Sequence, residues 1–177
     1  MTKEVYEHSV RQLVSTMEVC CKEKLVLPSL ILLYSGMDIM AWLSRDKSHV
    51  DSTRHDFTHW INTYLLPGHG FTCKAKDLYA ARCSILHSYT SESQLSRQGE
   101  AKKVFYSWGT AHPESLQQII DVSSEKDKVI VLHVDLLMDA FKEGVQRFNK
   151  ALSKDRSLSL LVYSRSNKFF TSIPFTD

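Results

Sequence analysis

The stretch from Ser29 to Ser44, which reads SLILLYSGMDIMAWLS, constrains the fold more than any other part of the chain. It is apolar nearly all round a helix, so a helix formed here must be covered on every side and lie at the centre of a bundle. The stretch is shorter than the roughly 18 to 20 apolar residues that span a bilayer, and Asp38 interrupts it. A buried central helix is therefore predicted, with no membrane attachment.

Helical periodicity also extends over most of the remaining chain. Apolar residues recur at the three-four spacing of one helical face in residues 3–24, 53–65, 74–87 and 135–152. Thr53 and Asp56 have the spacing of a variant capping box, and Asp135 is the predicted N-cap of the last of these helices. The predicted buried stripe of that helix consists of Leu137, Phe141, Val145, Phe148 and Leu152.

Two short runs, KVFYSW at 103–108 and KVIVLH at 128–133, are rich in valine, isoleucine and aromatics and predict strands. They are expected to pair as a small two-stranded ribbon backed by helices. Residues 113–122 between them predict a short helix, and residues 88–100 a polar loop that contains a turn of helix. Residues 157–170 fit both a helix, with Leu158, Leu161, Val162 and Phe169 on one side, and an alternating strand; helix is favoured.

The expected fold class is therefore mainly α: a single domain over residues 1–177, with about five to seven helices and one β-ribbon. The formal net charge of +2 argues against a protein that binds long nucleic acid by bulk electrostatics, so any nucleic-acid site is expected to be a local patch. The four cysteines form no CxxC pair and no zinc-site spacing, so they are expected to be free thiols. The first residues, MTKEVYEHSVRQL, lack the apolar core of a signal peptide, and we expect a reducing, cytoplasmic setting.

The side chains best suited to catalysis lie in residues 77–91, which read DLYAARCSILHSYTS. Here Arg82 and His87 place a permanent cation and an imidazole on or at the end of an otherwise apolar helix. Cleavage of RNA by internal transesterification needs a group that moves a proton and a cation that stabilises the charge on the phosphorane. Histidine suits the first task because its ordinary pKa is near neutral, and arginine suits the second because its planar fork binds phosphate oxygens. Neither step requires a metal or a cofactor.

The hexapeptide RCSILH at residues 82–87 has an arginine, four intervening residues and a histidine. It resembles the motif of the HEPN superfamily, helical domains of which many are metal-independent ribonucleases and in which the motif lies in the C-terminal part of a core helix. The resemblance covers the motif and the helical context from residue 3 to about residue 90. It implies a symmetric homodimer whose motifs meet at a cleft, and a use in toxin–antitoxin or antiviral defence systems. Cys83 departs from the polar residue that follows the arginine in many catalytic members.

The spacing of Arg82 and His87 constrains the site. On a straight helix, positions five apart lie about 140° and about 7.5 Å from one another, so the two side chains are not expected to converge on one phosphate. Either the helix breaks before His87, or a second copy of the chain completes the site across a two-fold axis. We therefore expect a homodimer.

A structural role for the same arginine is the alternative. Asp38 stands alone in the apolar central helix, and a buried carboxylate is costly unless it is paired. Asp38 is thus the first candidate partner of Arg82, and Asp77 is the second. The two roles are compatible, because a carboxylate that pairs with an arginine also orients it.

The segment after the motif supplies further candidate ligands for RNA. They are the hydroxyl-bearing Tyr89, Ser91 and Ser93 and the basic Arg97, Lys102 and Lys103. These side chains are predicted to line a phosphate-contacting groove beside His87, with the tyrosine stacked on an unpaired base. A solvated loop with ordinary surface lysines is the alternative.

The other histidines are weaker candidates for a functional site. His55 and His59 are four apart and have the spacing of a helical metal-binding pair, but no acidic ligand other than Asp56 accompanies them, so no metal site is expected. His133 lies inside the apolar run VIVLHVD and is expected to be a hydrogen-bonded histidine in the core or at the end of a strand.

The leading hypothesis is a metal-independent endoribonuclease that acts on RNA, with His87 as general acid or base and Arg82 as phosphate binder. The rival is a non-catalytic HEPN-like helical module that binds a nucleotide, RNA or a protein partner. Cys83 and the near-neutral charge favour the rival.

Overall fold

The computed structural model describes residues 3–168. Within them lie eight α-helices, one π-helical turn (η1) and two strands, so the predicted mainly helical class with a two-stranded sheet is confirmed. The count of eight exceeds the predicted five to seven by one, because the short helix α5 was predicted only as a helical turn within a loop. The elements are α1 (Lys3–Lys22), α2 (Val26–Ser44), α3 (Arg54–Trp60), η1 (Ile61–Leu65), α4 (Ala75–Ser88), α5 (Gln94–Arg97), β1 (Lys103–Ser107), α6 (Pro113–Asp121), β2 (Val129–His133), α7 (Val134–Lys154) and α8 (Arg156–Ser166).

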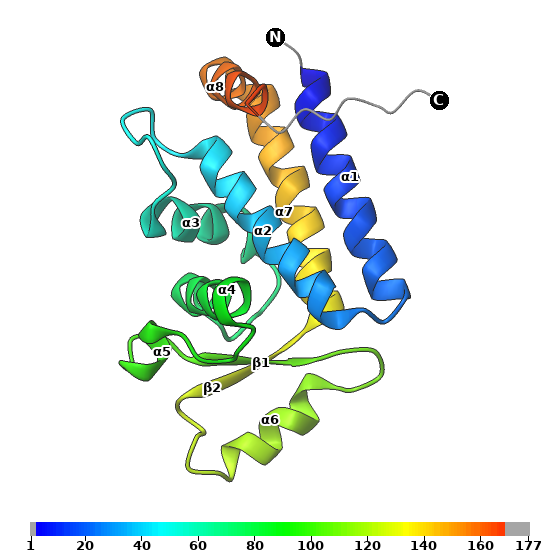
Figure 1. The fold of residues 1–177 in the computed structure, drawn as a ribbon, viewed down its shortest axis with the longest axis vertical. Helices are drawn as coiled ribbons and strands as arrows, with labels where there is room; N and C mark the ends of the chain where they lie inside the picture. The colour runs from blue at the N-terminus through cyan, green and yellow to red at the C-terminus, as the bar shows by residue number, and fades with distance from the viewer. Residues whose placement is uncertain (1–2, 169–177) are drawn as a thin grey trace.

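The apolar helix α2 lies at the centre, as its sequence predicts. It packs against α1, α3, α4, α7 and α8, and Figure 1 shows it crossing the long helix α7. Leu33, Met37 and Met40 have no exposed surface. By length and composition alone α2 could cross a membrane, but half of its apolar window is buried inside the protein. Its contacts with five other helices are those of a core helix.

Helix α7 buries the whole stripe predicted from its periodicity, from Leu137 to Leu152. Its predicted N-cap, Asp135, is wrong by two residues. The helix begins at Val134, and its N-cap is His133, whose Nδ1 accepts a hydrogen bond from the backbone N–H of Asp135 at 3.3 Å. Because β2 runs into α7 without a loop, the residue that ends the strand also caps the helix.

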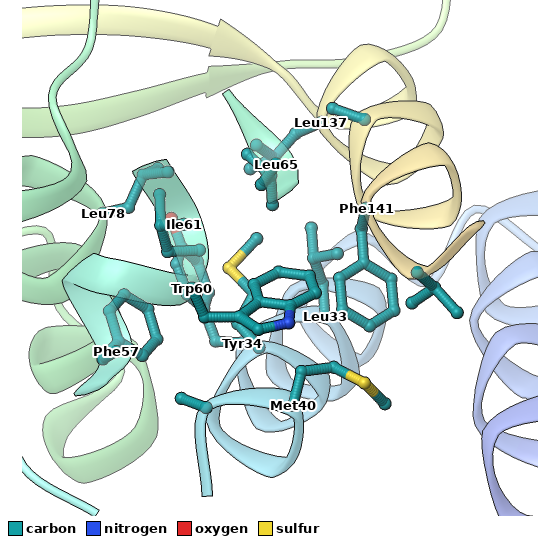
Figure 2. Packing of buried hydrophobic residues seen from close by; sticks show 14 of the residues in the cluster. Leu33, Tyr34, Met40, Phe57, Trp60, Ile61, Leu65, Leu78, Leu137 and Phe141 are labelled. Atoms are coloured by element: carbon teal, nitrogen blue, oxygen red, sulfur yellow. The ribbon is translucent and has the colours of Figure 1, made fainter. Parts of the chain in front are cut away.

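Residues 54–65 do not form one regular helix, because α3 passes into η1 at Ile61. The wider π turn lies where α7 approaches closely: a Cβ on Gly144 would lie only 3.1 Å from the Tyr64 carbonyl oxygen, and Arg147 donates a 2.7 Å hydrogen bond to that oxygen. Figure 2 shows the Trp60 indole packed in the core near Phe141. The capping box predicted at the start of α3 is confirmed.

The two strands pair in parallel, from Lys103 opposite Val129 to Ser107 opposite His133. The orientation follows from the connection, since α6 carries the chain from the end of β1 back to the start of β2. Figure 1 shows α4 on one side of this sheet and α6 on the other. Tyr34 and Tyr106 join α2 to β1 through hydroxyls 2.6 Å apart, and burial raises the pKa of both phenols.

The ambiguous C-terminal segment is helical from Arg156 to Ser166, which confirms the favoured helix over these residues; Phe169 lies outside the described residues. The buried Arg165 explains how α8 is held. Its Nη1 donates to the carbonyl oxygens of Leu43 at 2.9 Å and Arg45 at 2.6 Å, and so satisfies the C-terminal end of α2.

Candidate functional site

Helix α4 carries the motif, and Asp77 fixes its first turn. The Asp77 side chain, 3% exposed, accepts hydrogen bonds from the backbone N–H groups of Lys74 and Lys102, both at 2.8 Å. The first bond caps α4, and the second ties the helix to the segment that leads into β1. Asp77 is therefore not the partner of Arg82.

Helix α4 continues through His87 and ends at Ser88. Tyr89 then adopts the left-handed conformation, with φ of 53°, and turns the chain away. A helix break before His87, which was one of the two alternatives, is therefore absent.

Arg82 and His87 nevertheless meet within one chain. The Arg82 Nη1 lies 3.4 Å from the His87 Nε2. The expected divergence was wrong because it described the helix backbone, whereas the long arginine side chain bridges the difference in direction. A guanidinium only donates hydrogen bonds, so this contact requires Nε2 to accept and the imidazole proton to sit on Nδ1.

Asp38 holds the other side of the guanidinium. The Arg82 Nε donates to the Asp38 Oδ2 at 2.6 Å, between side chains that are 24% and 26% exposed. Burial raises the pKa of the Asp38 carboxyl, and Arg82 offsets only part of that rise. For Arg82, burial acts to lower the pKa, but the Asp38 carboxylate outweighs it and raises the pKa. The ion pair predicted between α2 and α4 is thus present, and the arginine stays charged.

Asp38 and His87 contact two of the three guanidinium nitrogens of Arg82. Nε is bonded to Asp38 and Nη1 faces His87, while Nη2 makes no hydrogen bond within residues 3–168. The adjacent Cys83 contributes only a weak contact, with its Sγ 3.9 Å from Nη1. A fixed guanidinium with an available donor next to an exposed imidazole can bind a phosphate oxygen within reach of a proton acceptor.

A cavity of about 500 Å³ opens beside this ion pair, between α2, the 52–57 region and α4. Asp38 and Arg82 form part of its wall, and the other lining residues are Ile39, Trp42, Ser52, Thr53, Phe57, Tyr79 and Lys168. The aromatic residues were not among the predicted site residues. Their spacing could have identified two of them, since Trp42 follows Asp38 by one helical turn and Tyr79 precedes Arg82 by one.

The predicted basic residues lie elsewhere. Arg97, Lys102 and Lys103 line a separate depression of about 620 Å³ rather than a groove beside His87. The bond from Lys102 to Asp77 places them at the N-terminal end of α4, and the ten residues from there to His87 correspond to about 15 Å along the helix. After α4 the chain runs back along the helix to reach β1, so nearness in sequence to His87 is misleading here.

The lining of that depression carries both positive and negative charges. Carboxylates line it along with the lysines, and Lys103 is held by Glu92 at 2.5 Å and by Glu125 at 3.8 Å. These contacts satisfy one of the three basic residues that were predicted to bind phosphate.

Of the three hydroxyl-bearing residues predicted to contact RNA, two lie just after the end of α4 and the third caps α5. Tyr89 is 67% exposed at the end of α4, directly after the helix that carries His87, and Ser91 is exposed nearby in sequence. Ser93 instead caps α5, where its Oγ accepts a hydrogen bond from the N–H of Ser96 at 3.2 Å.

The three other histidines that the sequence singled out, His133, His55 and His59, contact neighbouring groups. His133 lies at the end of β2, as expected, with its Nε2 3.1 Å from the Gly109 carbonyl oxygen. His55 and His59 stack with ring centroids 6.2 Å apart. Over residues 3–168, no group of three His, Cys, Asp or Glu side chains is placed to hold a metal ion.

Comparison with known proteins gives no matching family model, no matching curated protein and no matching solved structure. The likeness to HEPN domains therefore rests on the RCSILH motif and its helical setting.

Proposed function

We propose that this chain is a HEPN-like endoribonuclease that cleaves RNA by internal transesterification without a metal ion. One observation carries the proposal: Arg82 contacts His87 while Asp38 holds the guanidinium from the opposite side, at the edge of a cavity. The arrangement places a fixed cation, a proton acceptor and space for a substrate together.

In the proposed reaction, the His87 imidazole accepts the proton of a ribose 2′-hydroxyl. The 2′-oxygen forms a bond to phosphorus, and the bond from phosphorus to the 5′-oxygen breaks; that oxygen takes up a proton and leaves. Arg82 stabilises the negative charge on the phosphorane through Nη2, and through Nη1 once a phosphate oxygen replaces its contact with Nε2. The products are a 2′,3′-cyclic phosphate and a 5′-hydroxyl.

A homodimer belongs to this proposal. One imidazole cannot be base and acid in the same step, and a second His87 across a two-fold axis would protonate the leaving oxygen. The exposure of His87 supports such an approach. The cytoplasmic setting rests on the cysteines, which are predicted to be free, and on the lack of a signal-peptide core in the first residues. A toxin or defence role with an antitoxin partner follows from the family resemblance alone. Light scattering tests the dimer, and a strict monomer at micromolar concentration would contradict it.

Cleavage is tested with end-labelled single-stranded RNA in excess EDTA. The proposal predicts that the wild-type protein gives 2′,3′-cyclic phosphate ends and that His87→Ala reduces the rate by about 100-fold or more. His8→Ala is a matched control, because His8 is an exposed histidine on α1. Circular dichroism establishes that both variants fold. Equal cleavage by wild type and His87→Ala would overturn the assignment.

A non-catalytic binding module is the second candidate, and the Asp38–Arg82 pair favours it. The pair completes the wall of a partly aromatic cavity whether or not His87 reacts. This candidate predicts that RNA binds without being cut and that binding depends on Arg82 but not on His87.

A further inference from the structure

The depression at the N-terminal end of α4, with a volume of about 620 Å³, keeps positive charges that no carboxylate neutralises. Six cations line it, and two of them, Lys103 and Lys128, form ion pairs with Glu92 and Glu125. The other four are exposed and form no ion pair within residues 3–168. We call these four residues the free cations: Lys74, Lys76, Arg97 and Lys102.

The carboxylates of the depression are almost all engaged by other groups. Two of them hold the paired lysines. Asp77 accepts two backbone hydrogen bonds, and Glu100 pairs with Arg54 at 3.5 Å. Among the carboxylates that line the depression, Asp127 alone has no ion pair or hydrogen bond within residues 3–168. Four cations and one carboxylate thus remain for a ligand, which favours a ligand with several negative charges.

Exposed apolar side chains border the depression. Lys103, which lines the depression, and Phe105 lie two positions apart in β1, so their side chains share one face of the sheet and lie about 7 Å apart along the strand. Phe105 is 37% exposed. Val122, which is 89% exposed, follows the last residue of α6 and lies three residues before Glu125 of the depression. Apolar surface therefore lies at the edge of the depression.

Ile119 extends this apolar surface along α6. The buried Ile120 faces the sheet, and the Gln117 side chain accepts a 3.1 Å hydrogen bond from the backbone N–H of Val131 at the outer edge of β2. Because successive helical residues differ in direction by about 100°, Gln117 and Ile119 lie on opposite flanks of Ile120. Ile119, which is 66% exposed, is therefore on the flank toward β1. We call the three exposed apolar residues the apolar border: Phe105, Ile119 and Val122.

We infer that the depression and the apolar border together bind an acidic segment of a partner protein, with its carboxylates at the free cations and its apolar side chains on the apolar border. The inference does not rest on the proposed nuclease. RNA fits this surface less well, because no aromatic residue lines the depression and two of the three border residues are aliphatic, so few rings are present on which bases could stack. Asp127 would also repel a phosphate, whereas it can accept a hydrogen bond from a peptide N–H.

An array of short peptides tests the inference with the full-length protein. The number of carboxylates and the number of apolar residues vary independently across the array. The strongest binder is then labelled with fluorescein and titrated by fluorescence anisotropy at about 50 mM and about 300 mM salt. Lys76→Glu combined with Lys102→Glu reverses two free cations. Lys47→Glu combined with Lys150→Glu is the matched control, because these exposed lysines give the same change in net charge and do not line the depression.

The expected result is that binding across the array increases with both numbers. Reversal of the two free cations should weaken the strongest binder by about tenfold, and the control pair by less than about twofold. The higher salt concentration should weaken binding to the wild-type protein by about tenfold. Ile119→Ser should weaken binding by about threefold, whereas Val50→Ser, at an apolar residue that is 83% exposed outside the border, should not. Circular dichroism establishes that each variant folds.

Binding that does not depend on the carboxylates of the peptide, or equal losses in the charge-reversal variant and its control, would overturn the inference. An unchanged affinity in Ile119→Ser would overturn the role of the apolar border. The labelled peptide is also competed with a single-stranded RNA decamer in which every 2′-hydroxyl is methylated. Displacement by this RNA at a lower concentration than by the unlabelled peptide would assign the depression to nucleic acid and overturn the inference.

Discussion

The two ends of α4 present two different ways of collecting positive charge. The N-terminal end faces a depression with several lysines, but carboxylates neutralise part of it and Lys103 is held by two glutamates. The C-terminal half has one arginine, fixed by Asp38, in contact with His87 and beside a partly aromatic cavity. Under the proposed function, the orientation of a cation and an available donor determine the phosphate site more than the number of basic residues does.

The largest expected difference between the two ends concerns the shape of the cation. Arg82→Lys keeps the charge but removes the planar fork that joins Asp38, His87 and a phosphate, so the cleavage rate should fall by about 100-fold. Lys102→Arg, the converse exchange in the depression, should change the rate by less than about threefold, because only the backbone of Lys102 is bonded to Asp77. Single-turnover cleavage measures both. A larger change in the cleavage rate for Lys102→Arg than for Arg82→Lys would indicate that the phosphate binds in the depression instead.

The second-largest expected difference between the two ends of α4 concerns the free energy of unfolding. Asp38→Ala leaves a half-buried guanidinium without its carboxylate, and the free energy of unfolding should fall by about 1.5–3 kcal/mol. Lys103→Ala removes ion pairs whose acidic partners are 44% and 42% exposed, so the loss should stay below about 1 kcal/mol. Urea denaturation measures both variants. Equal losses would show that the Asp38–Arg82 pair is an ordinary surface contact.

A smaller and pH-dependent effect is expected at Asp56, which fixes Thr53 on the wall of the cavity. Burial acts to raise the pKa of the Asp56 carboxyl, but hydrogen bonds from Thr53 and His49 outweigh it and lower the pKa. A carboxyl with a lowered pKa stabilises the folded state at neutral pH, and that stabilisation disappears as the pH falls below about 4. Asp56→Asn should thus cost about 1 kcal/mol at pH 7 and less at pH 3.

Unfolding of Asp56→Asn and wild type at both pH values measures this difference. The depression offers a control, because Asp127 is an exposed carboxylate there, and Asp127→Asn should leave stability unchanged within about 0.5 kcal/mol at either pH. A loss for Asp56→Asn that is the same at pH 3 and pH 7 would show that its charge does not stabilise the fold.

Much of the fold was predictable because it depends on local periodicity. The apolar helix α2 and the buried stripe of α7 follow from spacing alone, and so does the capping box at Thr53. The π turn of η1 was not predictable, since the same spacing fits a regular helix and the cause lies in a different helix, where Gly144 permits close approach.

The candidate site was predictable in part. The pairing of Asp38 with Arg82 follows from the cost of a lone carboxylate in an apolar helix. The contact between Arg82 and His87 was missed because side-chain reach, rather than backbone angle, decides it. The basic residues were misplaced because a hydrogen bond from Lys102 to Asp77, 25 residues away in sequence, determines the path of the chain.

The most direct test of the central claim is a double-mutant cycle on the cleavage rate, with Arg82→Ala, His87→Ala and the two combined. Residues that act as one unit on a phosphate give non-additive losses. The proposed mechanism predicts that the cleavage rate of each single variant falls by about 100-fold or more and that the combined variant is no more than about tenfold slower than the slower single variant. Unchanged cleavage in the single variants, or losses that multiply fully in the combined one, would contradict it.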